Sequence, residues 1–155
     1  MTEKLKKASR LISAVQIHSI RLVDDVGKST IRSAGDIEAP KINVESSAKV
    51  PDLSKDGIFY VLASFDLQVL ADESKTPAAT LKATFELKYS LPKEMVEVTS
   101  EELTAFAEVN AIFNAWPYWR EFIQSTFVRM NLPPVLLPVF RLSGYVDRGE
   151  QKKGK

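Results

Sequence analysis

Hydrophobic and polar residues alternate strictly over two stretches in the middle of the chain. The odd positions from 59 to 71 are all apolar, and so are the odd positions from 79 to 91, whereas the even positions from 80 to 90 are polar. Because alternate side chains of a strand point to opposite faces, this pattern predicts a long antiparallel hairpin with one apolar and one solvated face. The intervening segment DESKTP supplies Asp, Ser and Pro residues, which are typical of turns.

Two segments upstream of the hairpin are also candidate strands. Residues 12–23 are rich in β-branched side chains and place apolar residues on both faces. Such a strand is either central in its sheet or covered by a partner molecule. Residues 40–46 predict a short strand whose leading proline suits a sheet edge or a strand start. Residues 29–39, between the two segments, indicate a loop.

A long helical pattern follows the hairpin. Thr99 and Glu102 form a capping-box motif, and apolar residues then recur in steps of three and four as far as Met130. This spacing predicts an amphipathic helix of about 30 residues with a broad apolar face. Pro117 removes one internal hydrogen bond and disfavours helical geometry at Trp116, so we expect a kink there.

The segment after the helix, residues 131–140, contains three prolines among large aliphatic residues. It ends the helix and predicts an extended, apolar crossover. The whole order predicts an α+β fold: a four-stranded antiparallel sheet, one long kinked helix packed on one side, and an apolar Pro-rich crossover. We expect residues 1–155 to form a single domain, with the basic segments 1–10 and 144–155 as mobile tails.

Composition limits the function classes. A formal net charge of +1 argues against a nucleic-acid-binding protein, and no apolar run is long enough for a signal peptide or a membrane span. We therefore expect a cytoplasmic protein without membrane insertion. Without cysteine there is no thiolate nucleophile, and neither a glycine-rich phosphate loop nor a catalytic spacing around His18, the one histidine, is present. We expect a protein that is not an enzyme and needs no cofactor or metal.

The chain carries more apolar surface than one copy can bury. A single helix covers one face of a sheet only in part, and the crossover adds large aliphatic residues where loops are usually polar. Soluble monomers rarely leave large apolar patches in water, so the pattern predicts a homo-oligomer whose remaining apolar surface binds other molecules.

The sequence resembles the SecB family of chaperones, in order and along most of the chain. Residues 15–24 look like the first strand of that family, and residues 39–70 resemble its second and third strands. The most specific resemblance is residues 110–140, which are similar to its long helix and crossover. The matching positions there are Asn114, Pro117, Tyr118, Arg120, Glu121, Leu137, Pro138 and Val139.

The resemblance implies a homotetramer, a dimer of dimers with helices between the sheets, that holds non-native polypeptides in surface grooves without ATP. SecB proteins are usually acidic and dock the translocation motor SecA. Here the chain is near neutral, with Asp24 at one family acid but Lys28 at the next. The second helix that normally follows the crossover is mostly absent. Relatives that guard the antitoxin of a toxin–antitoxin pair diverge in such ways, so either SecA or an antitoxin is an expected partner.

Candidate site residues follow from the aromatic cluster, the crossover and the first strand. Candidate client-binding residues are Phe113, Trp116, Tyr118, Trp119, Phe122, Leu132, Val135, Leu136, Leu137 and Phe140. Candidate oligomer-interface residues are Ile17, Ile20, Ile112, Ile123 and Phe127, and candidate partner-docking residues are Asp24 and Asp25. Core packing explains the aromatic rings equally well, most readily for Trp119. A non-catalytic small-ligand-binding or structural oligomer on the same fold is the alternative function.

Overall fold

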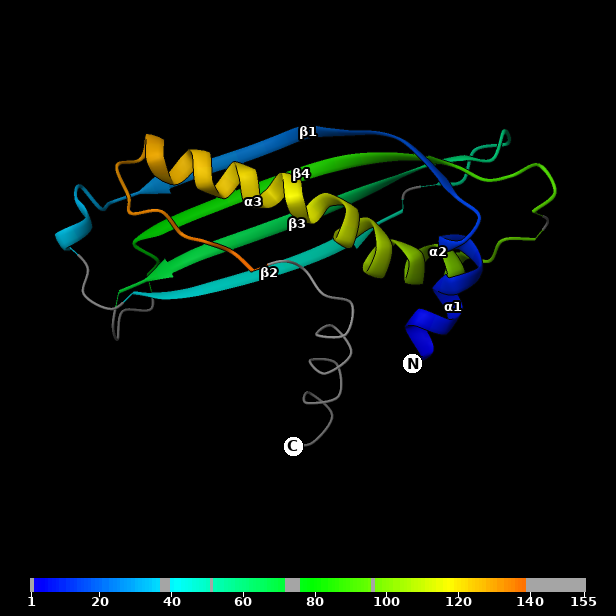
Figure 1. Cartoon of the computed structure of the whole chain (residues 1–155), viewed down its shortest axis with the longest axis horizontal. Helices are drawn as coiled ribbons and strands as arrows, with labels where there is room; N and C mark the ends of the chain where they lie inside the picture. The colour runs from blue at the N-terminus through cyan, green and yellow to red at the C-terminus, as the bar shows by residue number, and fades with distance from the viewer. Residues whose placement is uncertain (1, 37–39, 51, 72–75, 96, 139–155) are drawn as a thin grey trace.

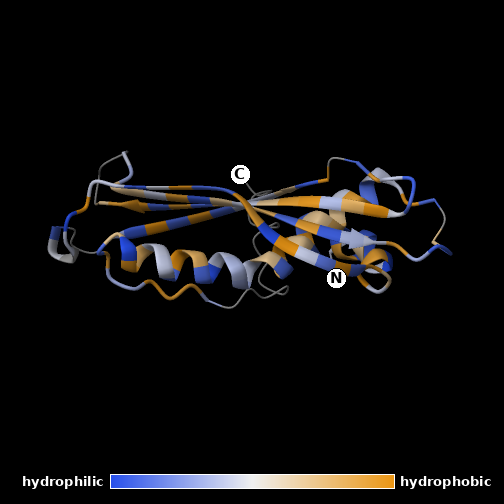
Figure 2. Cartoon of the chain, turned by 90° about the horizontal axis from the view of Figure 1, so that it is seen from above, coloured by the Kyte–Doolittle hydropathy of each residue, from blue (hydrophilic) through white to orange (hydrophobic). Residues whose placement is uncertain are grey.

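The computed structural model describes residues 2–36, 40–50, 52–71, 76–95 and 97–138. A single antiparallel sheet forms one layer and a long helix lies across one of its faces as the second (Figures 1 and 2). The sheet order is β1-β4-β3-β2. The strands are β1 (Gln16–Ser29), β2 (Lys41–Lys49), β3 (Ile58–Leu70) and β4 (Ala79–Ser90). The helices are α1 (Glu3–Ile12), the short 3-10 turn η1 (Ala34–Asp36), α2 (Ser100–Phe106), the π-helical segment η2 (Ala107–Ala111) and α3 (Ile112–Arg129).

The predicted hairpin is confirmed as β3 and β4. Its odd residues face the helix and are buried, from Phe59 to Val69 on β3 and from Ala79 to Tyr89 on β4. The even residues lie on the opposite face, where the hydroxyls of Ser64 and Thr84 form a hydrogen bond of 3.0 Å. We call these the helix-bearing face and the outer face.

Strand β1 is at the edge of the sheet rather than central, and two register shifts explain its irregular apolar pattern. Ile17 lies opposite Tyr89, Ile20 opposite Leu87 and Leu22 opposite Phe85. The shifts lie between Ile17 and Ser19 and between Leu22 and Asp24. Because a bulge inserts an extra residue, it places side chains at uneven sequence spacing on one face. Ile17, Ile20 and Leu22 therefore share the helix-bearing face with the three β4 residues they oppose.

The predicted helix is present as the continuous run of α2, η2 and α3. Its capping box is confirmed, because Thr99 Oγ1 accepts a hydrogen bond from the Glu102 amide and the Glu102 carboxylate accepts one from the Thr99 amide. Helical structure continues through Trp116 and Pro117, and the departure from α-helical geometry lies upstream, at η2. Among the described residues, no helix is both long enough and apolar enough to cross a bilayer.

Residues 1–10 were predicted to be a mobile tail, but residues 3–12 form helix α1. Ile12, predicted as the first residue of the first strand, belongs to this helix instead. Thr2 caps the helix, and Ala8 and Leu11 are fully buried against the rest of the chain. A helix of ten residues is marginal in isolation, so its stability comes from these tertiary contacts. Residues 144–155, the other predicted tail, lie outside the described residues.

The helix ends at the predicted place through a specific backbone motif. Asn131 has a φ of 57°, and the Leu132 amide donates to the Phe127 carbonyl at 2.9 Å while the Asn131 amide donates to the Val128 carbonyl at 3.1 Å. This pair of bonds is a Schellman motif, which Asn suits because it tolerates left-handed geometry. Its side chain also donates to the Arg32 carbonyl, so the turn fixes where the crossover starts.

Candidate client-binding surface

One stripe of α3 attaches the helix to the sheet. Its residues are Ile112, Ala115, Trp119, Ile123 and Phe127, all of them buried. The Trp119 ring stacks on Phe65 at 5.2 Å between centroids and on Phe122 at 5.7 Å. These contacts hold the helix in one position above the sheet and so determine which of its other side chains reach solvent.

This stripe corrects two groups of predictions. Ile112, Ile123 and Phe127 were expected at an oligomer interface, and they lie in the core of the single chain instead. Trp119 was expected among the client-binding residues, but its side chain has no exposed surface. The physical reason is shared: these residues lie at the centre of the helix face that the sheet covers, so the same chain already contacts them.

The crossover packs along one side of α3. The Trp116 indole nitrogen donates to the Pro138 carbonyl at 2.8 Å, which ties the end of the described crossover to the middle of the helix. Leu132 and Leu137 are buried and Val135 is half-buried, whereas Leu136 is 78% exposed. Of the crossover residues predicted to bind clients, Leu136 is thus the one that is open to solvent, and Phe140 lies outside the described residues.

The other side of α3 borders an open apolar surface that extends to the edge strand. Tyr118 lies 6.3 Å from Phe85, ring centroid to ring centroid, and Phe85 pairs with Leu22 on β1. Phe85 is buried, but Tyr118 is 49% exposed and Leu22 is 45% exposed. Ile17, two positions earlier on the same face, is 42% exposed. We call this region, formed by Ile17, Ile20, Leu22, Phe85 and Tyr118, the β1–α3 surface.

The two sides of α3 therefore differ in what covers them. Helix α3 crosses the sheet obliquely, and the crossover returns between α3 and β2 (Figure 1). At its last turn the helix reaches β1, where a Cβ on Gly27 would meet the Met130 side chain. The β2 side is filled by the chain itself, and the β1–α3 surface is left open.

Leu22 and Phe85 are the residues of this surface that were not among the candidate site residues. The signal was present, since β1 carries apolar residues at uneven spacing, but the bulges that align them cannot be read from spacing alone. Of the other predicted client-binding residues on α3, Phe113 is 41% exposed and Phe122 is half-buried.

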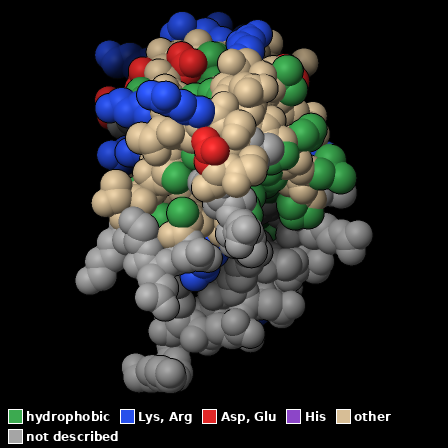
Figure 3. All heavy atoms as spheres, turned by 90° about the vertical axis from the view of Figure 1, so that its left-hand side faces the viewer, with side chains coloured by type: hydrophobic (Ala, Val, Ile, Leu, Met, Phe, Trp, Pro, Cys, Tyr) green, Lys and Arg blue, Asp and Glu red, His purple; other side chains and the backbone are tan. Residues whose placement is uncertain are grey.

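The outer face of the sheet carries charged side chains of both signs together with apolar ones such as Tyr60, which is 38% exposed. Arg21 pairs with Glu86 at 2.8 Å, and Lys82 pairs with Asp66 at 3.4 Å. At the end of the molecule nearest the β3–β4 turn, Lys and Arg side chains gather along the upper edge and hydrophobic side chains lie on one flank (Figure 3).

The predicted docking pair, Asp24 and Asp25, is divided between the two faces. Asp24 lies opposite Thr84 on the outer face, and Asp25 lies opposite Ala83 on the helix-bearing face. Neighbouring residues of a strand point in opposite directions, so the two carboxylates do not form one acidic spot. The structure therefore places the two predicted docking residues on different faces, and their docking role stays a prediction.

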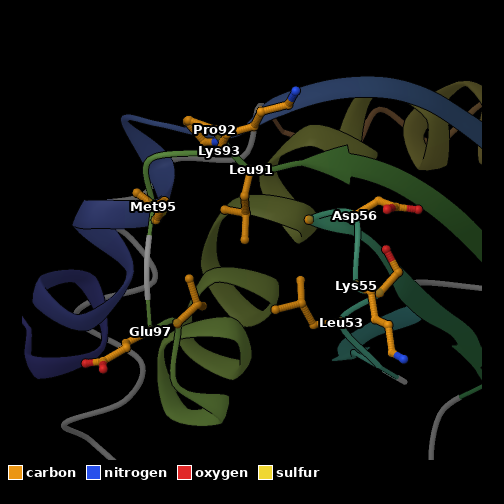
Figure 4. A pocket seen from close by; sticks show the side chains of 11 residues that line it. Leu53, Lys55, Asp56, Leu91, Pro92, Lys93, Met95 and Glu97 are labelled. Carbon is orange, nitrogen blue, oxygen red and sulfur yellow. The ribbon is translucent and has the colours of Figure 1, made fainter.

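A separate cavity of about 450 Å³ lies between the β2–β3 loop and the β4–α2 loop. Leu53 and Leu91 point into it, whereas the charged groups of Lys55, Lys93 and Glu97 point away (Figure 4). The interior of the cavity is therefore apolar, and the charged residues lie at its edge.

Comparison with known proteins agrees with this fold. No family model matches the chain. The solved structure of the Mycobacterium tuberculosis SecB-like chaperone Rv1957, in complex with a ChAD peptide from the Rv1956 HigA1 antitoxin, is similar with a TM-score of 0.78 and 25% identity. The match covers 90% of this chain and 100% of that one. An uncharacterized protein of Methanocaldococcus jannaschii, MJ0357, is 32% identical over 60 residues, which span 39% of each protein.

The chain matches this SecB-like chaperone over nearly its whole length. Its four-stranded antiparallel sheet, long helix and apolar crossover are therefore the architecture of a SecB-like protein. The structural match over 90% of the chain supports the SecB-like family that residues 110–140 resemble.

Proposed function

We propose that this protein is an ATP-independent chaperone that holds an extended apolar segment of a non-native polypeptide on the β1–α3 surface. The observation that carries the proposal is the grouping of Tyr118 and Leu22, each nearly half exposed, around the buried ring of Phe85. Exposed apolar side chains from two elements, adjacent in space, are typical of a binding surface. The similarity to a chaperone solved with a bound peptide supports the same role.

The chemistry of the surface suits an extended segment of varied sequence. Tyr118 offers a flat ring with a polar hydroxyl, which gives large contact area at low cost in side-chain entropy. The edge of β1 borders the surface, and its outward-facing backbone groups are able to pair with an added strand. Backbone pairing is independent of sequence, so the side chains of Ile17 and Leu22 would select for apolar clients.

Among possible clients, we propose the apolar tail of an antitoxin. The SecB-like neighbour was solved with an antitoxin peptide. The outer face, with its Arg21–Glu86 and Lys82–Asp66 pairs, lacks the single-sign acidic character that docking to SecA implies. The discriminating measurement is a titration with both peptides: binding of the antitoxin tail without binding of the SecA carboxy-terminal segment is expected. Tight binding of the SecA segment would instead support an export role.

We also propose that the chain assembles into a homotetramer, a dimer of dimers. Four apolar residues of β1, Ile17, Leu22, Val23 and Val26, are each between 37% and 45% exposed. Covering part of this edge with a second copy would remove apolar area from water, and the remainder would stay available to clients. Sedimentation velocity tests the proposal, and a stable monomer at micromolar concentration would contradict it.

A matched pair of tyrosine variants tests the client surface. Tyr118→Ala removes a ring of the β1–α3 surface, whereas Tyr60→Ala removes a ring that is 38% exposed on the outer face, opposite Lys88. Tyr118→Ala should weaken suppression of aggregation of a denatured model protein about tenfold, by analogy with aromatic anchors of interfaces. Tyr60→Ala should behave as wild type. If circular dichroism shows that both variants are folded and they suppress aggregation equally well, clients do not bind at the β1–α3 surface.

A further inference from the structure

The side of α3 that faces away from the sheet carries exposed residues along most of the helix. At 3.6 residues per turn, this side lies opposite the buried stripe that is centred on Trp119. Its exposed residues are Phe113, Pro117, Glu121, Gln124 and Val128. Val128 is 68% exposed and Phe113 is 41% exposed, so apolar area meets water near both ends of this side. We call it the outward face of α3.

Two charged residues at the middle of α3 have no ion-pair partner among the described residues. The Nε of Arg120 is buried and has no hydrogen-bond partner, and the side chain of Glu121 is exposed. Neighbouring residues of a helix point in different directions, so the two side chains do not satisfy each other. A buried donor on a cation is costly to leave unpaired, so Arg120 calls for an acceptor from outside the described chain.

Two antiparallel copies of α3 would supply that acceptor. A two-fold axis at the midpoint between Arg120 and Glu121 places each Arg120 beside the partner's Glu121, because such an axis brings the same patch of both copies together. Each copy then contributes one cation and one carboxylate to two identical ion pairs. A guanidinium–carboxylate pair can be bidentate, which fixes orientation as well as distance.

The same axis also matches the apolar ends of the outward face. Phe113 and Val128 are equally far from the midpoint, so Phe113 of one copy lies against the partner's Val128. Removing both side chains from water favours association. A parallel arrangement would instead bring Arg120 against the partner's Arg120, and like charges in contact are unfavourable. The antiparallel arrangement is therefore the one that satisfies both the charged centre and the apolar ends.

We propose that the outward face of α3 is a subunit interface, at which a second copy of this chain packs antiparallel with reciprocal Arg120–Glu121 ion pairs at the centre. This inference rests on the proposed homotetramer and assigns one of its two kinds of contact. The exposed apolar residues of β1 supply the other kind. Tyr118 is directed towards Phe85 and β1 rather than outward, so the interface does not require the β1–α3 surface.

Charge reversal tests the interface in the full chain. Glu121→Arg would bring cations together at the axis, and it should leave the fold intact because Glu121 is exposed. Arg120→Glu would bring carboxylates together at the same place. Each single variant should raise the dissociation constant of tetramers into dimers on the order of 100-fold, as measured by sedimentation velocity. The double variant Arg120→Glu with Glu121→Arg exchanges the signs of both pairs and should restore a value near that of wild type.

The double variant also identifies the occupant of the outward face. Only a second copy of this chain carries the exchanged charges, so a client polypeptide bound there would not restore binding. Lys55→Glu, at an exposed position in the β2–β3 loop, makes the same change in net charge as Arg120→Glu and should leave the tetramer unchanged.

The outcomes separate this interface from the proposed function. A wild-type monomer would overturn both the homotetramer and the α3 interface. If wild type is a tetramer and the folded Glu121→Arg protein remains one, the α3 interface alone is wrong. A double variant that stays as dissociated as the single variants would also overturn the α3 interface and leave the homotetramer standing.

Discussion

The side-chain amide of Asn114 on α3 donates a hydrogen bond of 2.9 Å to the phenol oxygen of Tyr89 on β4. Tyr89 is fully buried, stacks on Phe59 at 5.3 Å and meets the edge of Phe106 at 5.0 Å. A buried hydroxyl without a partner is costly, so this bond stabilises the register between helix and sheet. Asn114 lies in the first turn of α3, one turn before Tyr118 of the β1–α3 surface.

Replacing either partner of this bond should lower stability. Tyr89→Phe leaves the half-buried amide of Asn114 without its acceptor, and we expect a loss of about 1–2 kcal/mol in the free energy of unfolding. Urea unfolding followed by circular dichroism measures this loss. The double variant Tyr89→Phe with Asn114→Leu should recover part of it, since neither polar group is then left unpaired. A Tyr89→Phe protein as stable as wild type would show that the bond contributes nothing.

Tyr89 should also titrate abnormally. Burial raises its pKa to about 12, with the Asn114 hydrogen bond acting in the opposite direction. In the unfolded chain the phenol ionises near pH 10, so between pH 10 and 12 the unfolded state binds fewer protons than the folded state. Stability should therefore fall as pH rises through this window. Titration of tyrosinate absorbance in wild type and in Tyr89→Phe checks the raised pKa. The variant should lack the phenol that titrates near pH 12. If the variant instead lacked a phenol that titrates near pH 10, the prediction would be wrong.

The two tryptophans should differ in their effect on stability. Trp119 is fully buried against Phe65 and Phe122, so Trp119→Ala should cost about 3–5 kcal/mol. Trp116 is half-buried, and Trp116→Ala should cost less while freeing the crossover through loss of the bond to Pro138. Urea unfolding of both variants measures the difference. If Trp119→Ala were the milder substitution, the assignment of Trp119 to the core would fail.

Acid should weaken the start of α2 through Glu102. The hydrogen bond from Arg10, with a further one from the Thr99 amide, lowers the pKa of this carboxyl to about 2. Because the folded pKa lies below the unfolded one, the contribution is present above about pH 4.5 and is lost as pH falls towards 2. Glu102→Gln should remove about 1 kcal/mol of the stability difference between pH 7 and pH 3. The control is Glu3→Gln on α1, and an unchanged pH profile in Glu102→Gln would disprove the role.

The elements that sequence reasoning identified correctly rest on local backbone geometry. The hairpin followed from a period of two between positions 59 and 91, and the start of α2 followed from the Thr99–Glu102 capping box. Each signal depends only on residues close in sequence. The end of the long helix near Asn131 was also predictable from local sequence, because the prolines that follow exclude further helix.

The elements that were missed depend on distant partners. Helix α1 does carry local signals, with Thr2 at its N-cap and apolar residues at helical spacing. Ten residues are marginal as an isolated helix, however, so its stability depends on burial of Ala8 and Leu11 against distant parts of the chain. The bulges of β1 are invisible in the local sequence, because they are set by pairing with β4. Asp24 and Asp25 looked like one acidic spot in sequence, and strand geometry separates them.

By itself, the sequence determined the order of the four strands and the long helix, the apolar face of the hairpin, the cap of that helix and the family resemblance, because all of these depend on short-range patterns. The tertiary structure alone decided which aromatic rings are buried and which are open. A helix presents several apolar stripes, and only its packed position on the sheet buries Trp119 while leaving Tyr118 beside Leu22 at the surface.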